Sequence, residues 1–148
     1  YLDGLTSIDK DVAQELVKSW GVLSLDGLTS IDKDVAHELA KFRGTLSLDG
    51  LTSIDKDVAK ELSKCKASYM QLRGLDSIDK GVAEELAKFQ GFQMELSGLT
   101  SIDTDVAHGL AKFQGDFLFL CGLTSIDKDV LKILKSNPKI LLHKKHHH

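Results

Sequence analysis

Short stretches in which apolar and polar residues alternate recur along the chain. The stretch 23–26 reads Leu-Ser-Leu-Asp, and the same alternation returns at 46–49, 70–73 and 94–97. Alternation with a period of two predicts a short strand that buries one face. A glycine and a bend follow each stretch, after which two further apolar residues, Leu28 and Ile31 in the second unit, are expected to point inward.

The part of each unit after the bend predicts a helix of about ten residues. In the second unit the apolar face consists of Val35, Ala36, Leu39, Ala40 and Phe42. The remaining positions are expected on the solvent face, namely Lys33, His37, Glu38 and Lys41. Across the copies, one buried helix column is predicted from Leu16, Leu39, Leu62, Leu86 and Leu110.

Residues near both ends of this helix indicate where it begins and where it ends. Asp32 is placed to cap the N-terminus, because its carboxylate can accept from the free backbone N–H groups of the first turn. Asp34 adds negative charge where the helix dipole favours it. Gly44 predicts a residue in the left-handed conformation that ends the helix.

This unit occurs six times. The segment Gly-Leu-Thr-Ser-Ile-Asp-Lys-Asp-Val-Ala starts unchanged at Gly4, Gly27 and Gly50, and edited copies start at Gly74, Gly98 and Gly122, so the period is 23 or 24 residues. One unit of this size cannot bury its strand face, bend and helix face alone. Stacked copies bury them against one another, which predicts an α/β solenoid with parallel strands on one side and helices on the other.

The repeated L-x-L-x-G-L-T-S-I followed by a capped helix resembles the leucine-rich-repeat family, and within it bacterial repeats of the form L-x-L-x-G-L-T-S-L-S-P-E-V-A-x-A-L-A. The resemblance covers residues 1–142 and implies one solenoid domain with concave strands, convex helices and a bacterial origin. The usual asparagine ladder is missing, because the only asparagine, Asn137, lies outside the strands. The bends are therefore expected to be held by backbone hydrogen bonds and by side chains such as those of Thr29 and Ser30.

The composition is that of an ordinary soluble domain, with 42% hydrophobic residues, 28% charged residues and a net charge of −3. This charge gives no electrostatic reason to expect nucleic acid as a partner. No apolar run approaches the roughly 18–20 residues that span a bilayer. The lysines near the C-terminus lack interleaved aromatic residues, which favours a solvated cap over a nucleic-acid patch.

Candidate catalytic and metal-binding groups follow the structural period. The Ser-Ile-Asp triplets, such as Ser30 to Asp32, recur in every copy and are explained by helix capping. His37 and His108 occupy a position that is Gln, Lys or Glu elsewhere, which indicates solvent. The repeated glycines lack the spacing of a phosphate-binding loop. We therefore expect no enzyme activity, no cofactor, no catalytic residue and no metal site.

The two cysteines occupy different positions in their repeats, which does not fit a disulfide framework or a zinc site. A reducing compartment such as the cytoplasm fits best. Cys65 replaces the phenylalanine of other copies (Phe42, Phe89 and Phe113) and is expected to be a buried thiol. Cys121 lies on the predicted strand face and is expected to be the more exposed and reactive one.

The outward strand positions vary between copies, whereas the framework is nearly constant. The columns run Val22, Thr45, Tyr69, Gln93, Phe117; then Ser24, Ser47, Gln71, Glu95, Phe119; then Asp26, Asp49, Arg73, Ser97, Cys121. The resemblance implies that this concave surface binds partners, and exposed Tyr, Arg and Phe are frequent interface residues. The predicted partner-binding residues are Tyr69, Gln71, Arg73, Gln93, Glu95, Phe117, Phe119 and Cys121.

Two interpretations of Phe117 and Phe119 stay open. Either they contact a partner, or the C-terminal segment or further repeats cover them. If they are exposed together with Arg73, the patch is expected to suit a partner that offers carboxylates and an apolar side chain.

The two ends of the chain are expected to differ from the inner repeats. Residues 139–142 are expected to add a strand as a partial cap, and 143–148 to form a tail that includes a tag remnant. Tyr1-Leu2 is expected to lie in an uncapped strand, which suggests a longer parent chain or end-to-end association.

The leading function is a non-catalytic protein-interaction scaffold, a fragment of a larger bacterial protein. The alternative is a structural spacer or a self-associating array, including a consensus-designed one.

Overall fold

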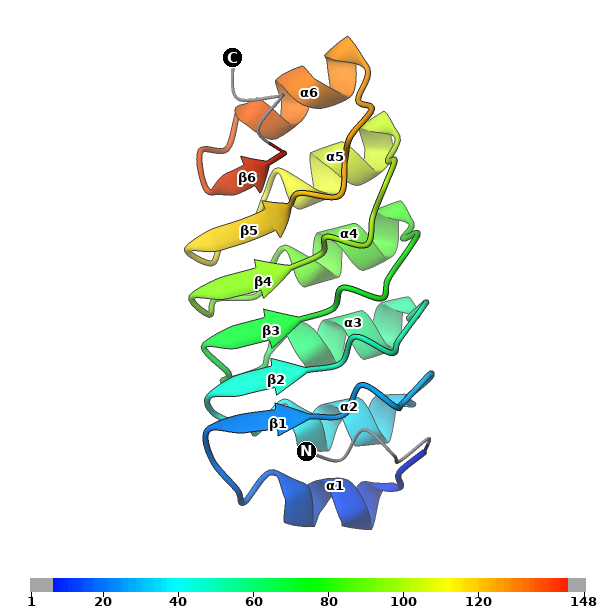
Figure 1. Ribbon diagram of the computed structural model, residues 1–148, viewed down its shortest axis with the longest axis vertical. Coiled ribbons are helices and arrows are strands. Elements are labelled where there is room, and N and C mark those ends of the chain that lie inside the picture. The colour runs from blue at the N-terminus through cyan, green and yellow to red at the C-terminus, as the bar shows by residue number, and fades with distance from the viewer. Residues whose placement is uncertain (1–6, 144–148) are drawn as a thin grey trace.

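The computed structural model, described for residues 7–143, is a single stack of alternating helices and strands (Figure 1). Its helices are α1 (Lys10–Leu16), α2 (Lys33–Leu39), α3 (Lys56–Ser63), α4 (Lys80–Leu86), α5 (Thr104–Leu110) and α6 (Lys128–Lys135). Its strands are β1 (Val22–Ser24), β2 (Thr45–Ser47), β3 (Tyr69–Gln71), β4 (Gln93–Glu95), β5 (Phe117–Leu120) and β6 (Ile140–Leu142). None of the described helices has the length and apolar character needed to cross a bilayer.

All the described strands pair in parallel and in sequence order, β1-β2-β3-β4-β5-β6. The helices lie on one side of this sheet, so the predicted α/β solenoid is confirmed (Figure 1). Strand β6 is the further strand expected within residues 139–142. The strand expected at Tyr1-Leu2 lies outside the described residues.

The N-cap read from the sequence is confirmed in every described helix. The cap residues all have extended backbone, and each accepts a hydrogen bond from the backbone N–H three positions later: Asp9, Asp32, Asp55, Asp79, Asp103 and Asp127. For Asp32 the distance from Oδ1 to the Val35 nitrogen is 2.8 Å. Gly44, with a φ of 111°, adopts the expected left-handed conformation, but it does not end the helix, because α2 ends at Leu39 and its C-cap is Ala40.

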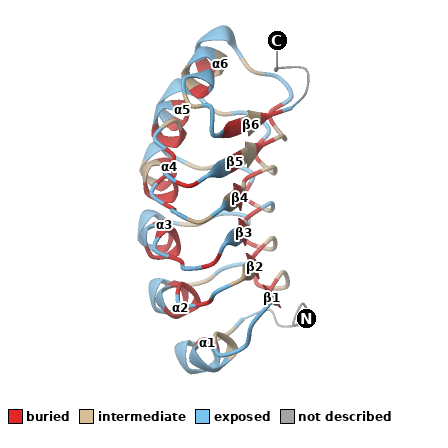
Figure 2. Cartoon of the chain, turned by 90° about the vertical axis from the view of Figure 1, so that its left-hand side faces the viewer, coloured by how far each residue is buried: buried red, intermediate tan, exposed pale blue. Residues whose placement is uncertain are grey.

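The core is continuous from one unit to the next, as the buried inner side of the stack shows (Figure 2). In the predicted leucine column, Leu39, Leu62, Leu86 and Leu110 are buried. Leu16 is only partly buried, which corrects the prediction for that residue, because no described helix packs on the outer side of α1. Cys65 is buried, as expected.

The helix face predicted to be solvated contains one column that is buried. Glu38, Glu61 and Glu85 are 2%, 7% and 7% exposed, so the prediction for Glu38 was wrong. The reason is that these carboxylates lie between neighbouring helices and find partners there. Gln14 Nε2 donates to Glu38 Oε1 at 3.1 Å, and His37 Nδ1 lies 3.2 Å from Glu61 Oε1.

This arrangement makes stability depend on pH. The Lys41 ammonium and the Gln14 amide lower the pKa of Glu38 below 4.5 through hydrogen bonds. A depressed carboxyl pKa contributes stability that is present above the unfolded-state value and is lost as the pH falls through the folded-state value. We expect Glu38→Gln to lower the melting temperature at pH 7 and to have a smaller effect at pH 3. Thermal unfolding at both pH values checks this, and an equal loss at both would contradict it.

Candidate functional site

Side chains of the three variable columns lie on the sheet face directed away from the helices, which we call the strand face. Burial alternates along β3 as the pleat requires, because Met70 is buried whereas Tyr69 is 39% exposed. In β5, Leu118 is buried whereas Phe117 is 37% exposed. The register pairs successive strands position by position, so the first and second columns cross the stack in line, and the third column follows in the turns after the strands.

Three exposed rings form a line near the strand starts, and we call Tyr69, Phe92 and Phe117 the aromatic row. The ring centroids of Tyr69 and Phe92 are 5.5 Å apart, and those of Phe92 and Phe117 are 5.3 Å apart. Both pairs meet edge to face, a favourable geometry for aromatic rings. The sequence prediction missed Phe92, which is 42% exposed and precedes β4 by one residue, outside the alternating stretch.

The last strand leaves this row open. Strand β6 pairs alongside β5, with Leu141 opposite Phe119, and so extends the sheet. Phe119 is half-buried and Phe117 remains exposed. Within residues 7–143, β6 therefore does not cover the two phenylalanines.

The bends are linked along the stack by aspartates, which we call the aspartate ladder. Asp26 Oδ1 accepts from the Asp49 backbone N–H at 2.8 Å and from the Ser47 hydroxyl at 2.6 Å. Asp49 Oδ1 accepts from the Arg73 backbone N–H at 2.8 Å. Backbone bonds such as Leu28 N to Leu25 O close each bend, as predicted.

The prediction for the side chains at the bends was wrong. Thr29 and Ser30 are exposed, and the carboxylates of the third variable column connect the units instead. The ladder ends at Arg73, the first residue of that column without a carboxylate after Asp49.

Arg73 is held by carboxylates of its own chain. Its guanidinium contacts Asp49 Oδ2 at 2.8 Å, and its Nε lies 3.4 Å from Glu95 Oε2. The hydrogen bond to Asp49 raises the pKa of Arg73 further. Its NH2 group also donates to the Gln71 side chain at 3.3 Å. The expected partner carboxylate would have to compete with these groups for Arg73.

Charge on the strand face is negative overall. The variable columns contain three carboxylates, Asp26, Asp49 and Glu95, and one guanidinium, Arg73, which leaves a net charge of −2. Glu95 Oε2 is buried and accepts no hydrogen bond in the described part of the chain, and its ion-pair partner Arg73 Nε lies 3.4 Å away. A cation is therefore the complementary charge for this face.

The remaining predicted residues, Gln93 and Cys121, lie on the strand face but differ in their surroundings. Gln93 is half-buried in the first column, beside the aromatic row. Cys121 is half-buried, hence more exposed than Cys65 as expected. Burial, and then the negative charge of Glu95, raise the pKa of the Cys121 thiol. Its thiolate fraction at neutral pH is therefore reduced, which argues against the expected reactivity.

Across residues 7–143, no group of three or more His, Cys, Asp and Glu side chains is arranged to hold a metal ion. The sequence matches no protein-family model and no curated protein sequence.

Proposed function

We propose that the protein is a non-catalytic interaction scaffold of leucine-rich-repeat type, whose strand face binds an extended partner segment that carries both basic and apolar side chains. The observation that carries this proposal is the aromatic row. It consists of three rings, each 37–42% exposed, in line across successive units.

The aromatic row supplies the apolar part of the proposed contact. Rings held edge to face are already ordered, so these side chains lose little conformational entropy when a partner packs on them. The backbone beneath the row is fixed by the parallel pairing of β3, β4 and β5. Aromatic side chains on such a rigid support are typical interface anchors.

The carboxylates supply the preference for a basic partner. The net charge of −2 in the variable columns favours lysine or arginine, and the nearby ring faces can also accept cations. Arg73, already paired with Asp49 and Glu95, contributes little attraction for an acidic partner. A segment that alternates basic and apolar residues would match both features.

A self-associating array is the second candidate, and a separate observation favours it. Trp20 is 90% exposed and Val22 is 54% exposed at the α1 end of the stack. A second copy that packs there would bury both side chains. Sedimentation of the protein over a range of concentrations, with Trp20→Ala for comparison, distinguishes this candidate from the scaffold.

The scaffold proposal is tested by selection from a displayed library of random linear peptides at about 0.15 M salt. Enriched peptides should combine Lys or Arg with apolar residues. The triple variant Tyr69→Ala/Phe92→Ala/Phe117→Ala should bind synthetic copies of these peptides at least about 30-fold more weakly, because interface anchors carry most of the binding free energy.

The matched control is Trp20→Ala, which removes an exposed aromatic ring outside the row. It should leave affinity within about twofold. Circular dichroism should show that the triple variant keeps its fold, because all three rings are exposed. Equal binding by the folded triple variant and the wild-type protein would refute the proposal.

A further inference from the structure

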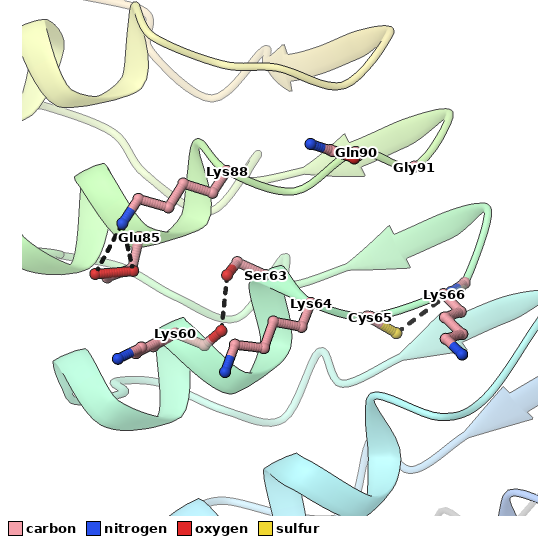
Figure 3. Close-up of a pocket in the computed structure, with 10 residues that line it drawn as sticks. Lys60, Ser63, Lys64, Cys65, Lys66, Glu85, Lys88, Gln90 and Gly91 are labelled. Atoms are coloured by element: carbon pink, nitrogen blue, oxygen red, sulfur yellow. Dashed lines mark hydrogen bonds and ion pairs between the residues drawn. The ribbon is translucent and has the colours of Figure 1, made fainter.

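A second surface feature lies between the third and fourth units, away from the variable columns. It is a cavity of about 570 Å³ between the end of α3, the loop before β3 and the end of α4 (Figure 3). This size is within the range of small-ligand pockets. We call it the lysine cavity, because Lys60, Lys64, Lys66 and Lys88 line it.

The lysine cavity lies beside the third unit, the one among the four inner units that lacks a phenylalanine at the end of its helix. Cys65 takes the place of Phe42, Phe89 and Phe113. Between the next two units, where both phenylalanines are present, the corresponding cavity is about 270 Å³. The smaller thiol therefore accounts for the additional space.

A second sequence difference in the same loop supports the link between the lysine cavity and the missing phenylalanine. A Cβ added at Gly91 would overlap Phe89 Cζ, and one added at Gly115 would lie 2.8 Å from Phe113 Cζ. The phenyl ring and the glycine thus occur together in those units. In the third unit Ala67 takes the place of the glycine, which is possible because Cys65 brings no ring.

The lysine cavity is positively charged in a protein whose net charge is −3. Its lining has four lysines and one carboxylate, Glu85, which is paired with Lys88 at 3.2 Å. Lys64 has Glu61 at 3.6 Å. Lys60 and Lys66 have no carboxylate within 4.0 Å in the described part of the chain, so their charges are available to an anion.

The floor adds no negative charge. Burial raises the pKa of the Cys65 thiol to about 11, which keeps it neutral at pH 7. Cys65 and Ala67 provide an apolar floor, and Ser63 is occupied by its hydrogen bond to the Lys60 carbonyl at 2.7 Å (Figure 3). A suitable ligand has a compact apolar body and a multiply charged anionic group.

We propose that the lysine cavity binds small organic phosphates. Lysine binds phosphate as a point charge, whereas planar carboxylates are better matched by arginine, which this cavity lacks. This proposal is independent of the strand face, because the two sites share no residue.

The probe is phenyl phosphate, with inorganic phosphate as the anionic group alone, at about 0.15 M salt. Titration followed by amide NMR shifts should be saturable and should perturb residues around Cys65 and Gly91. Lys60→Gln/Lys66→Gln should weaken binding about fivefold or more, because it removes the two unpaired charges. The control Lys33→Gln/Lys128→Gln, at two exposed helix starts, should stay within about twofold.

A second variant tests the cavity itself. Cys65→Phe/Ala67→Gly restores the phenylalanine and glycine of the other units and should weaken phenyl phosphate binding about tenfold or more with the fold retained. Unchanged affinity in this folded variant would overturn the proposal, as would equal losses in both lysine double variants. If the filled variant does not fold, the comparison between the two lysine variants decides.

Discussion

Replacing Gly74 by alanine is expected to destabilise the fold by about 3 kcal/mol or more. A Cβ at this position would overlap the Asp49 carbonyl oxygen and lie 2.8 Å from the Leu51 carbonyl oxygen. Both atoms belong to the backbone of the preceding unit, which cannot move without breaking the parallel register. The same close approach recurs at Gly50, Gly98 and Gly122. Glycine at the bend is thus a requirement of stacking.

Gly81→Ala is the matched control, because Gly81 lies within α4 in a less crowded position. The nearest atoms to an added Cβ there are Asp79 Oδ1 and Lys56 Cδ, both at 3.4 Å. Alanine should stabilise the helix there by about 0.5–1 kcal/mol. Chemical denaturation of both variants measures the difference. A loss below about 1 kcal/mol for Gly74→Ala would show that the units are not packed this closely.

Leu86→Ala is expected to cost roughly 2–5 kcal/mol of unfolding free energy. Leu86 is fully buried in α4, with α3 on one side of that helix and α5 on the other. Truncation leaves a cavity that the neighbouring units cannot close without shifting the stack.

The comparison variant is Leu16→Ala, in the same column of the repeat but only partly buried. It should cost less than half as much, because less apolar surface is removed from burial and solvent can fill the space. Urea denaturation gives both values. Equal losses of unfolding free energy for Leu86→Ala and Leu16→Ala would mean that Leu16, at the α1 end, is as well buried as Leu86.

The architecture could be predicted from the sequence because six copies repeat the same local signals. Alternation at 23–26, the cap at Asp32 and the glycine at 44 each predict a short element, and recurrence dictates how the elements stack. The parallel sheet was predicted correctly because the local signals and their recurrence indicate the same arrangement.

The errors concern side chains whose environment is set by the neighbouring unit. Glu38 is on the polar face of an isolated helix, yet it is buried once Gln14 of the preceding unit lies against it. Arg73 resembled a free interface residue, but Asp49 of the preceding unit holds it. Phe92 lies outside the alternating stretch, so no periodic pattern identified it. Reading positions i and i+24 together would have identified the contacts of Glu38 and Arg73, whereas Phe92 meets Tyr69 and Phe117 at separations of 23 and 25 residues.

Binding on the strand face can be mapped residue by residue with a peptide selected on the wild-type protein. Amide NMR shifts recorded during titration with that peptide should change most at 69–73, 92–95 and 117–121. The largest changes in the helices α2 to α5, or around Trp20, would contradict binding through the aromatic row.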